Sequence, residues 1–289
     1  MAEGLDLDHV AVVVRDLDIA ERNFKRLGFL LTPRSSHKGP VPPDGRIEPW
    51  GTGNHCSMFR QGYLELLGIT DPARHKTHIE RRLSKYEGLH LIAFGTDDAH
   101  GTAKVIRDRG APIGDPADLG RDVPYGDTTR PGRFAIANLD ADRFPEADFI
   151  VIEQMTRDVL WQPALLTQPN GVVSLESVTI CSDDPDDLLR RLTPVLGNPS
   201  NGGFDLSPGR VEICVPSEMS ARFPGHGLPG EAPCVVAATF GVDDLAATRN
   251  TLVANGVEID VGDVIRVGAE IGCGSIIEFA PAKETGDHP

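Results

Sequence analysis

The stretch that decides the fold is Leu7-Asp8-His9-Val10-Ala11-Val12-Val13-Val14, an apolar run that carries one imidazole. A short apolar run bounded by polar residues predicts a buried strand. Asp16 follows it, and Gly28 comes twelve residues later. An Asp carboxylate accepts hydrogen bonds from the free amides of a first helical turn, and Gly takes the left-handed conformation that ends a helix. The stretch therefore predicts a strand followed by a helix of about three turns.

The same unit recurs three times further along the chain. Each copy has an apolar strand, an Asp that begins a helix, a Gly that ends it, and short strands behind. The later pairs are Asp98 with Gly110, Asp184 with Gly197, and Asp244 with Gly256. The repeat predicts an α+β protein of four βαβββ modules, at residues 7–70, 86–160, 172–216 and 232–281. Residues 163–171 have a linker composition, so we expect domains at 1–162 and 163–289.

Composition excludes several classes of function. The chain has 289 residues and a net charge of -15, which argues against a general nucleic-acid surface. It shows no apolar run long enough for a membrane span and no leader pattern, so a cytoplasmic protein is expected. The five cysteines are scattered and odd in number, which favours buried thiols over a disulfide framework.

Polar residues stand at matching places in the first two modules. His9 and His90 lie in the opening strands, and Glu65 and Glu153 lie in the closing strands. A carboxylate among apolar neighbours is costly to bury unless it is paired, protonated or bound to a metal. Two imidazoles and two carboxylates match a divalent cation in charge and in number. We therefore expect these four side chains to meet at one point.

At these motifs the chain resembles the vicinal oxygen chelate superfamily, and within it the glyoxalase-like domain group, which shares the glyoxalase, bleomycin resistance and extradiol dioxygenase fold. The motifs that carry the resemblance are Leu7-Asp8-His9-Val10 with Asp16-Leu17-Asp18, Gly51-Thr52-Gly53-Asn54-His55, Tyr63-Leu64-Glu65-Leu66, Leu89-His90-Leu91 and Ile152-Glu153-Gln154. They cover the first half well, whereas the second half matches in repeat pattern alone. The resemblance implies that modules pair and curl into half-open barrels, two in this chain, with a metal in the cleft.

Members with glyoxalase I activity carry His, Glu, His and Glu at equivalent strand positions. The resemblance thus implies that His9, Glu65, His90 and Glu153 hold one divalent metal ion, which is Ni, Zn, Co, Mn or Fe. Two coordination positions then stay open for water or for substrate oxygens. The second half lacks these ligands, because Ser177 falls where His9 does and Val236 where His90 does, while Glu212 and Glu278 remain at the module ends.

Several further residues are candidates for the pocket. His55 is expected to be a hydrogen-bond donor or proton shuttle, a substitute ligand, or a strand residue satisfied by the backbone. Asn54 and Trp50 near it are expected to contact substrate. Two long segments, 33–52 and 115–133, are expected to be loops that flank the cleft. Their arginines, among them Arg121, Arg130 and Arg133, are expected to hold a carboxylate or phosphate of the substrate, with Arg130 and Arg133 as the chosen candidates.

These residues suggest three functions. The first is a metal-dependent lyase or isomerase that polarises two adjacent oxygens of a small substrate, with Glu153 or Glu65 moving the proton in an isomerisation, epimerisation or elimination. The second is an extradiol-type Fe(II) dioxygenase built on His9, His90 and Glu153, against which Glu65 argues. The third is a non-catalytic small-molecule binding protein. The expected partner is a small molecule, with no nucleic acid and no membrane, and the chain is expected to be a monomer or a homodimer.

Overall fold

The computed structural model describes residues 4–42 and 44–283, and it contains the four predicted helix units. The long helices are α1 (Leu17–Arg26), α3 (Ala99–Asp108), α5 (Pro185–Leu196) and α7 (Leu245–Ala254). The predicted Asp begins each of them, and its carboxylate accepts from amides of the first turn. The predicted Gly after each helix has a positive φ, between 67° and 91°. Local sequence alone therefore places all four helices correctly.

The first two modules form one eight-stranded sheet, sheet A, in the order β2-β3-β4-β1-β5-β8-β7-β6. Its central strands β1 and β5 are antiparallel, and each pairs in parallel with the last strand of its own module. The strands are β1 (Asp6–Val14), β2 (Ser35–Val41), β3 (Arg46–Met58), β4 (Tyr63–Ile69), β5 (Gly88–Gly95), β6 (Ala117–Tyr125), β7 (Thr128–Asn138) and β8 (Asp148–Glu153).

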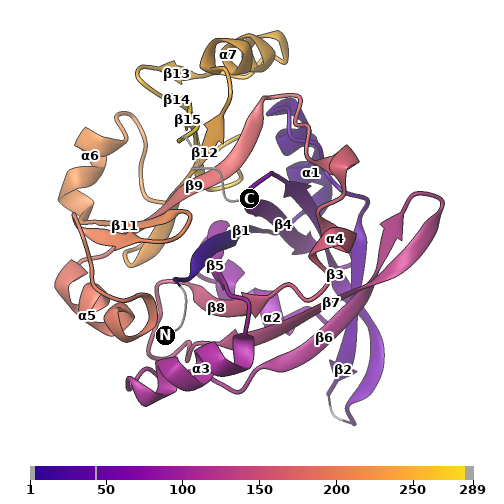
Figure 1. Ribbon diagram of the computed structural model, residues 1–289. Helices are drawn as coiled ribbons and strands as arrows, with labels where there is room; N and C mark the ends of the chain where they lie inside the picture. Colours follow the sequence, from indigo (N-terminus) through magenta and orange to yellow (C-terminus); the bar gives the residue numbers. More distant parts are fainter. Residues whose placement is uncertain (1–3, 43, 284–289) are drawn as a thin grey trace.

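The last two modules form the seven-stranded sheet B, in the order β10-β11-β9-β12-β15-β14-β13. The third module is one strand short, so its unit reads βαββ. The strands are β9 (Val172–Cys181), β10 (Gly203–Asp205), β11 (Arg210–Cys214), β12 (Cys234–Val242), β13 (Asp260–Val261), β14 (Ile265–Val267) and β15 (Ile276–Pro281). The fold is the expected α+β arrangement of repeated modules in two curled sheets, shown in Figure 1 with sheet A in indigo to magenta and sheet B in orange to yellow.

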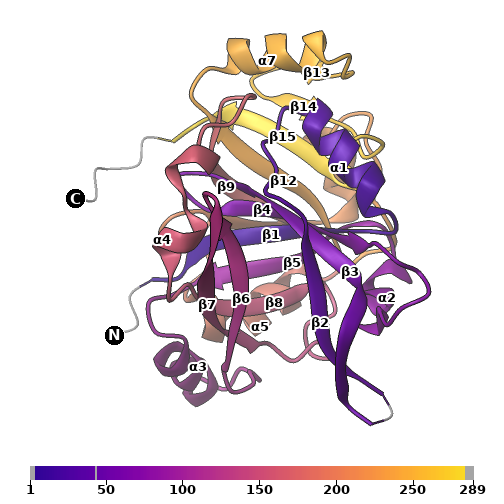
Figure 2. The same cartoon turned by 90° about the vertical axis from the view of Figure 1, so that its right-hand side faces the viewer.

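One hydrophobic core joins the two sheets and their long helices. Buried side chains of β1, β4 and β5 belong to the same cluster as those of β9, β12 and β15. The Phe29 ring lies 5.4 Å from Phe240 and 6.0 Å from Phe279, ring centre to ring centre. The ends of α1 and α7 also meet, because Arg26 donates to the carbonyl of Gly256; Figure 2 shows the two helices next to each other.

The other face of sheet A is concave, and two short segments cover its ends. At one end α2 (Thr77–Leu83) packs Ile79 and Leu83 against Val13. At the other end α4 (Arg157–Leu160) leads into Trp161, which packs with Cys56 and Met58. We call this concave face, between the two covers, the cup. The remaining short helices are η1 (Pro163–Leu165), η2 (Pro216–Glu218) and α6 (Met219–Arg222).

The two segments expected to be loops are β-hairpins. Residues 33–52 contain β2 and the start of β3, and residues 115–133 contain β6 and the start of β7. Their many polar residues hid the strand pattern, since both faces of a hairpin that extends from the body stay partly exposed. Among the described residues, none of the helices has both the length and the apolar character needed to span a bilayer.

Candidate functional site

A carboxylate and an imidazole from consecutive residues are hydrogen-bonded at the start of β1. The Nδ1–H of His9 donates to Oδ1 of Asp8 at 2.6 Å, and Gln154 donates to the same oxygen at 3.1 Å. A bulge in the pairing with β5 leaves Asp8 without a partner, and bulges re-aim side chains in this way. The His9 ring stacks on Tyr63 with centroids 4.2 Å apart. Because Asp8 fixes the Nδ1–H tautomer, Nε2 of His9 keeps its lone pair.

Glu65 lies on the neighbouring strand, on the same face as His9. Its register partner on β1 is Ala11, two positions beyond His9, which puts the Cα atoms of His9 and Glu65 about 8 Å apart. Nδ2 of Asn54 donates to Oε1 of Glu65 at 2.5 Å. Oδ1 of the same amide accepts from Arg121 at 3.4 Å. Asn54 thus connects a carboxylate and a guanidinium inside the cup.

Three further side chains border this group. A second bulge lies on β3, where residues 50–52 stand opposite His37 of β2, and Nδ1 of His37 bonds Oγ1 of Thr52 at 3.0 Å. Burial lowers the pKa of His37 below its ordinary value, and Glu65 partly offsets this. Burial raises the pKa of the Cys56 thiol to about 12 and that of the Tyr63 hydroxyl well above its usual range. At neutral pH the cup thus holds a neutral thiol, a neutral phenol and a neutral His37.

The cup has a polar half and an apolar half. The polar half comes from β1, β3 and β4, with Arg121 reaching in from β6. The apolar half comes from β5, β7 and β8. Its side chains are Leu91, Ala93, Phe134, Ile136, Ile150 and Ile152. Such a surface suits a small ligand with an oxygen-bearing end and an apolar body.

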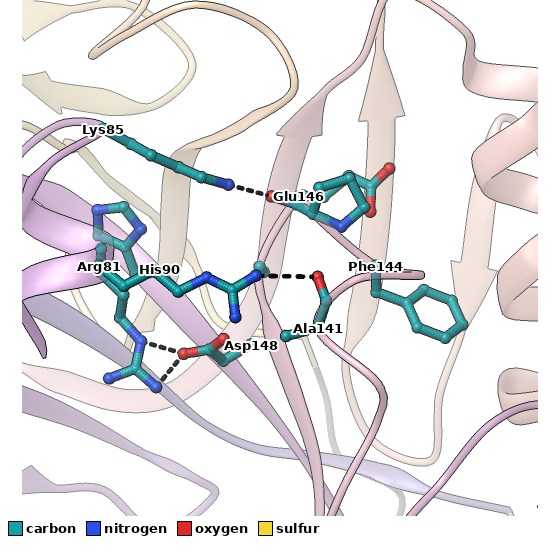
Figure 3. A pocket seen from close by; sticks show the side chains of 10 residues that line it. Arg81, Lys85, His90, Ala141, Phe144, Glu146 and Asp148 are labelled. Atoms are coloured by element: carbon teal, nitrogen blue, oxygen red, sulfur yellow. Dashed lines mark hydrogen bonds and ion pairs between the residues drawn. The ribbon is translucent and has the colours of Figure 1, made fainter. Parts of the chain in front are cut away.

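His90 does not face the cup. It is the extra residue of a third bulge, between Leu89 and Leu91, and its Nε2 lies 3.0 Å from the carbonyl of Tyr86, on whose ring it stacks. Burial lowers its pKa to about 4, which the bond to Tyr86 partly offsets. His90 lines a separate pocket of about 140 Å³ with Arg81 and Asp148, shown in Figure 3.

Glu153 also lies apart from His9 and Glu65. Its neighbours Val151 and Phe149 on the same face belong to the core between the sheets, while Ile150 and Ile152 face the cup. Oε2 of Glu153 accepts from the backbone amide of Ala99, the first residue of α3, at 3.0 Å. Its carboxylate therefore stabilises the positive end of a helix. It also lines a pocket of about 230 Å³ that includes Asp8.

The symmetry of sheet A explains why the expected four side chains do not meet. His9 pairs with Ala93 and Ala11 pairs with Leu91, so the two-fold relation of β1 and β5 matches His9 to Leu91. Ala11 pairs with Glu65 and Ala93 pairs with Ile150, which matches Glu65 to Ile150. The second module thus presents two apolar side chains where the first presents an imidazole and a carboxylate.

The donor set therefore does not fit the divalent ion that the resemblance implied. Of the four predicted ligands, only His9 and Glu65 face the cup, so an ion held by both would lack two of the expected protein ligands. Within 4–42 and 44–283, no group of three or more His, Cys, Asp or Glu side chains is arranged to hold a metal. The triad of His9, His90 and Glu153 expected for an Fe(II) dioxygenase is not assembled either.

In sheet B, different residues occupy the positions that correspond to His9, Leu91 and Glu65 of sheet A. Ser177 and Ala237 correspond to His9 and Leu91, and Val236 occupies a bulge like that of His90. Glu212 and Glu278 correspond to Glu65. Each is paired with an arginine, Glu212 with Arg222 and Glu278 with Arg266 at 2.6 Å. Here arginine side chains neutralise the carboxylates.

Of the remaining predicted site residues, Asn54 is the one that contacts Glu65 in the cup. Alternation puts His55 on the opposite face from Asn54, where its ring contacts the carbonyl of Thr32 at 2.7 Å and Glu21 at 3.3 Å. Trp50 packs edge-on against His75. Arg130 stacks on Tyr125 near the hairpin end with 3.9 Å from guanidinium to ring centre, and Arg133 is exposed. Arg121 and Arg133 lie on opposite faces of the hairpin, because the register partner of Arg121 is Gly132, and Arg133 is one residue further along β7.

Sequence reasoning missed Asp8 and Gln154 as members of the site, and among the arginines of residues 115–133 it singled out Arg130 and Arg133 in place of Arg121. One signal was present in the sequence: His9 stands seven residues before the Asp16 cap, and seven before the Asp98 cap stands Leu91, not His90. The number of residues between the matched strand position and the Asp that begins the helix is the same in both modules. Counting back from that Asp therefore reveals the bulge, which the alternation of side chains along the strand does not.

Comparisons with known proteins agree with this fold. A crystal structure of a hypothetical protein from Staphylococcus aureus is 14% identical, with a TM-score of 0.63 over 96% of this chain and 100% of that one. A 4-hydroxymandelate synthase mutant from Streptomyces coelicolor is 12% identical, with a TM-score of 0.59 over 99% and 95%. The 2,3-dioxygenase LapB from Pseudomonas is 13% identical, with a TM-score of 0.52 over 100% and 95%. At these identities the likeness shows the fold alone.

No curated protein matches the chain by sequence. Residues 7–196, more than half of the 289, match the family described as a glyoxalase-like domain. The match begins at the quoted strand and runs through α5. The chain belongs to the glyoxalase-like domain family.

Proposed function

We propose that this protein is an enzyme that binds a small molecule with adjacent oxygens in the cup and moves a proton on it. The observation that carries the proposal is the 2.6 Å bond between His9 and Asp8, in a cup that also holds Glu65. A carboxylate that holds one ring nitrogen leaves the other as an oriented base. The family membership agrees with a small-molecule site at this place in the fold.

In the proposed reaction, Nε2 of His9 takes a proton from the carbon next to a carbonyl. Asp8 stabilises the imidazolium that forms, because its carboxylate bonds the Nδ1–H. Glu65 has one oxygen held by Asn54, and its carboxylate accepts a hydrogen bond from a hydroxyl of the substrate. Returning the proton to the same or a neighbouring atom gives epimerisation or isomerisation, and losing a neighbouring group gives elimination.

The test is exchange of carbon-bound hydrogen in heavy water. Lactate, mandelate, glycerate and pyruvate are incubated with the full chain, and loss of the C–H signal is followed by proton NMR. We expect exchange of at least one of them above the uncatalysed rate. The variants His9→Asn and Asp8→Asn should slow it about 100-fold or more, as loss of a positioned base does. Added EDTA should not change the rate, because the cup lacks a four-ligand donor set.

A matched control separates this role from a loss of folding. His100→Asn removes an exposed imidazole of α3 and should leave exchange unchanged. Circular dichroism and thermal melting of each variant check the fold. Binding of these acids without any exchange would favour the non-catalytic binding protein. Exchange that survives in both cup variants would rule out His9 as the base.

A further inference from the structure

We propose that the ligand of the cup is an anion, a small carboxylate, and that Arg121 is the residue that selects it. The inference rests on the proposed site and names its substrate class. Arg121 is half-buried on β6 and makes no ion pair with any residue in the described part of the chain. Its Nη1 donates to Oγ of Ser35 at 3.2 Å and to Oδ1 of Asn54 at 3.4 Å.

No hydrogen-bond partner of Arg121 carries a negative charge, and the Glu65 carboxylate, which helps to raise the pKa of Arg121, forms no ion pair with it. Ser35 and Asn54 are uncharged, and Cys56 next to it is a thiol because burial raises its pKa to about 12. A guanidinium is always charged, and a charge partly removed from water without a counter-charge is unfavourable. An anionic ligand would supply the missing charge in a bidentate pair, the geometry that arginine prefers with carboxylates.

Asn54 lies between the charges of Glu65 and Arg121. Its amide bonds Glu65 with one end and Arg121 with the other, so the two opposite charges share a bridge and stay beyond ion-pair distance. Without this bridge the two side chains would be free to pair directly. The arrangement leaves Glu65 for a hydroxyl group and Arg121 for a carboxylate.

A second donor without a partner among the described residues shares the neighbours Tyr63 and Cys56 with Arg121. Nε1 of Trp161 is buried, and none of the described residues accepts its hydrogen. Trp161 contacts Tyr63 with rings 5.6 Å apart and packs on Cys56, and both residues also border Arg121. A buried indole N–H usually has an acceptor. A carboxylate between the two residues would accept from both, with the apolar body of the ligand against Phe134 and Ile152.

The experiment compares acids with their neutral amides at equilibrium, without turnover. Acetate, benzoate and mandelate, each with its amide, are titrated into the full chain by calorimetry. We expect at least one acid to bind 10-fold or more tighter than its amide, and the preference to weaken with salt. Arg121→Gln should lower acid affinity at least 10-fold and leave amide affinity unchanged. Arg121→Lys should restore part of the preference, because it restores the charge.

Arg130→Gln is the matched control. It removes a guanidinium from the same hairpin, but one that is exposed and stacks on Tyr125. It should leave binding unchanged. Equal affinity for acids and amides, or a preference that Arg121→Gln does not alter, overturns the inference. So does failure of all three acids to bind. Arg121-dependent binding without hydrogen exchange supports this inference and refutes proton transfer, so the two can fail separately.

Discussion

Asp6 is a buried carboxyl with an incomplete set of hydrogen bonds. Its Oδ1 has no partner among the described residues. Burial, followed by the nearby charge of Asp8, raises its pKa from 3.8 to about 6. The folded protein therefore binds a proton there at a pH where the unfolded chain does not. Because the folded pKa is the higher one, the contribution to stability is present below about pH 4 and is lost as the pH rises through about 6.

Asp6→Asn should stabilise the protein at pH 8, and by about a third as much at pH 4.5. A shift of about two pKa units corresponds to about 3 kcal/mol at most. Partial exposure reduces this, so we expect a gain of about 1–2 kcal/mol in the free energy of unfolding. Urea unfolding of both proteins at the two pH values measures it. Asp142→Asn, at a highly exposed carboxylate, is the control. An equal effect of Asp6→Asn at both pH values would show that Asp6 does not titrate as proposed.

At the scale of the element, two bulges decide which polar residues of the central strands enter the cup. The bulge at Asp8 places that residue beside the site, and the bulge at His90 removes that imidazole from it. A one-residue shift moves a strand's side chains to the other face. The glutamate of β8 misses the cup because Ile150, three residues earlier, holds the position matched to Glu65.

Restoring the matched positions should create a metal site. In the double variant Leu91→His with Ile150→Glu, the two new side chains and the natural His9 and Glu65 would together present four ligands to the cup. We expect the double variant to bind one equivalent of Co(II) at least 100-fold more tightly than the natural chain does. The visible absorption of the bound Co(II) measures the binding. The metal-free variant should lose a few kcal/mol of stability, since a carboxylate replaces a buried isoleucine.

Two controls test whether the register is correct. Adding Glu65→Gln to the double variant should abolish the gain, because it removes one of the four ligands. Adding His90→Gln should leave Co(II) binding unaltered, because His90 faces another pocket. A loss of binding on His90→Gln would mean that the matched position is His90 and not Leu91.

At the scale of the whole molecule, the two sheets share their core. The division into domains 1–162 and 163–289 stays a prediction, but the hydrophobic cluster is continuous across it. Phe240 of sheet B packs against Phe29 and Phe59 of the first half, with ring centres 5.4 and 5.5 Å apart. Elements that share one core are expected to unfold together.

A substitution in the second half should therefore destabilise the first. Both tryptophans, Trp50 and Trp161, lie in the first half, so their fluorescence reports on that half alone. Phe240→Ala should lower the free energy of unfolding seen by tryptophan by about 3–5 kcal/mol, the usual cost of removing a buried phenylalanine ring. Val261→Ala, at an exposed position of sheet B, should have little effect. An unchanged tryptophan transition in Phe240→Ala would show that the halves unfold independently.

The sequence by itself determined the modules, their helices and the family, because those depend on local signals. An Asp cap, a Gly stop and an apolar strand each act over a few residues, and Asp16 and Gly28 are read correctly without a structure. It also predicted His9, Glu65 and Asn54 as site residues, and the structure places these three on the same face of sheet A. The tertiary structure decided which side chains meet, because strand register and bulges arise from pairing between distant strands. That pairing turned His90 and Glu153 away from the cup and brought Arg121 into it.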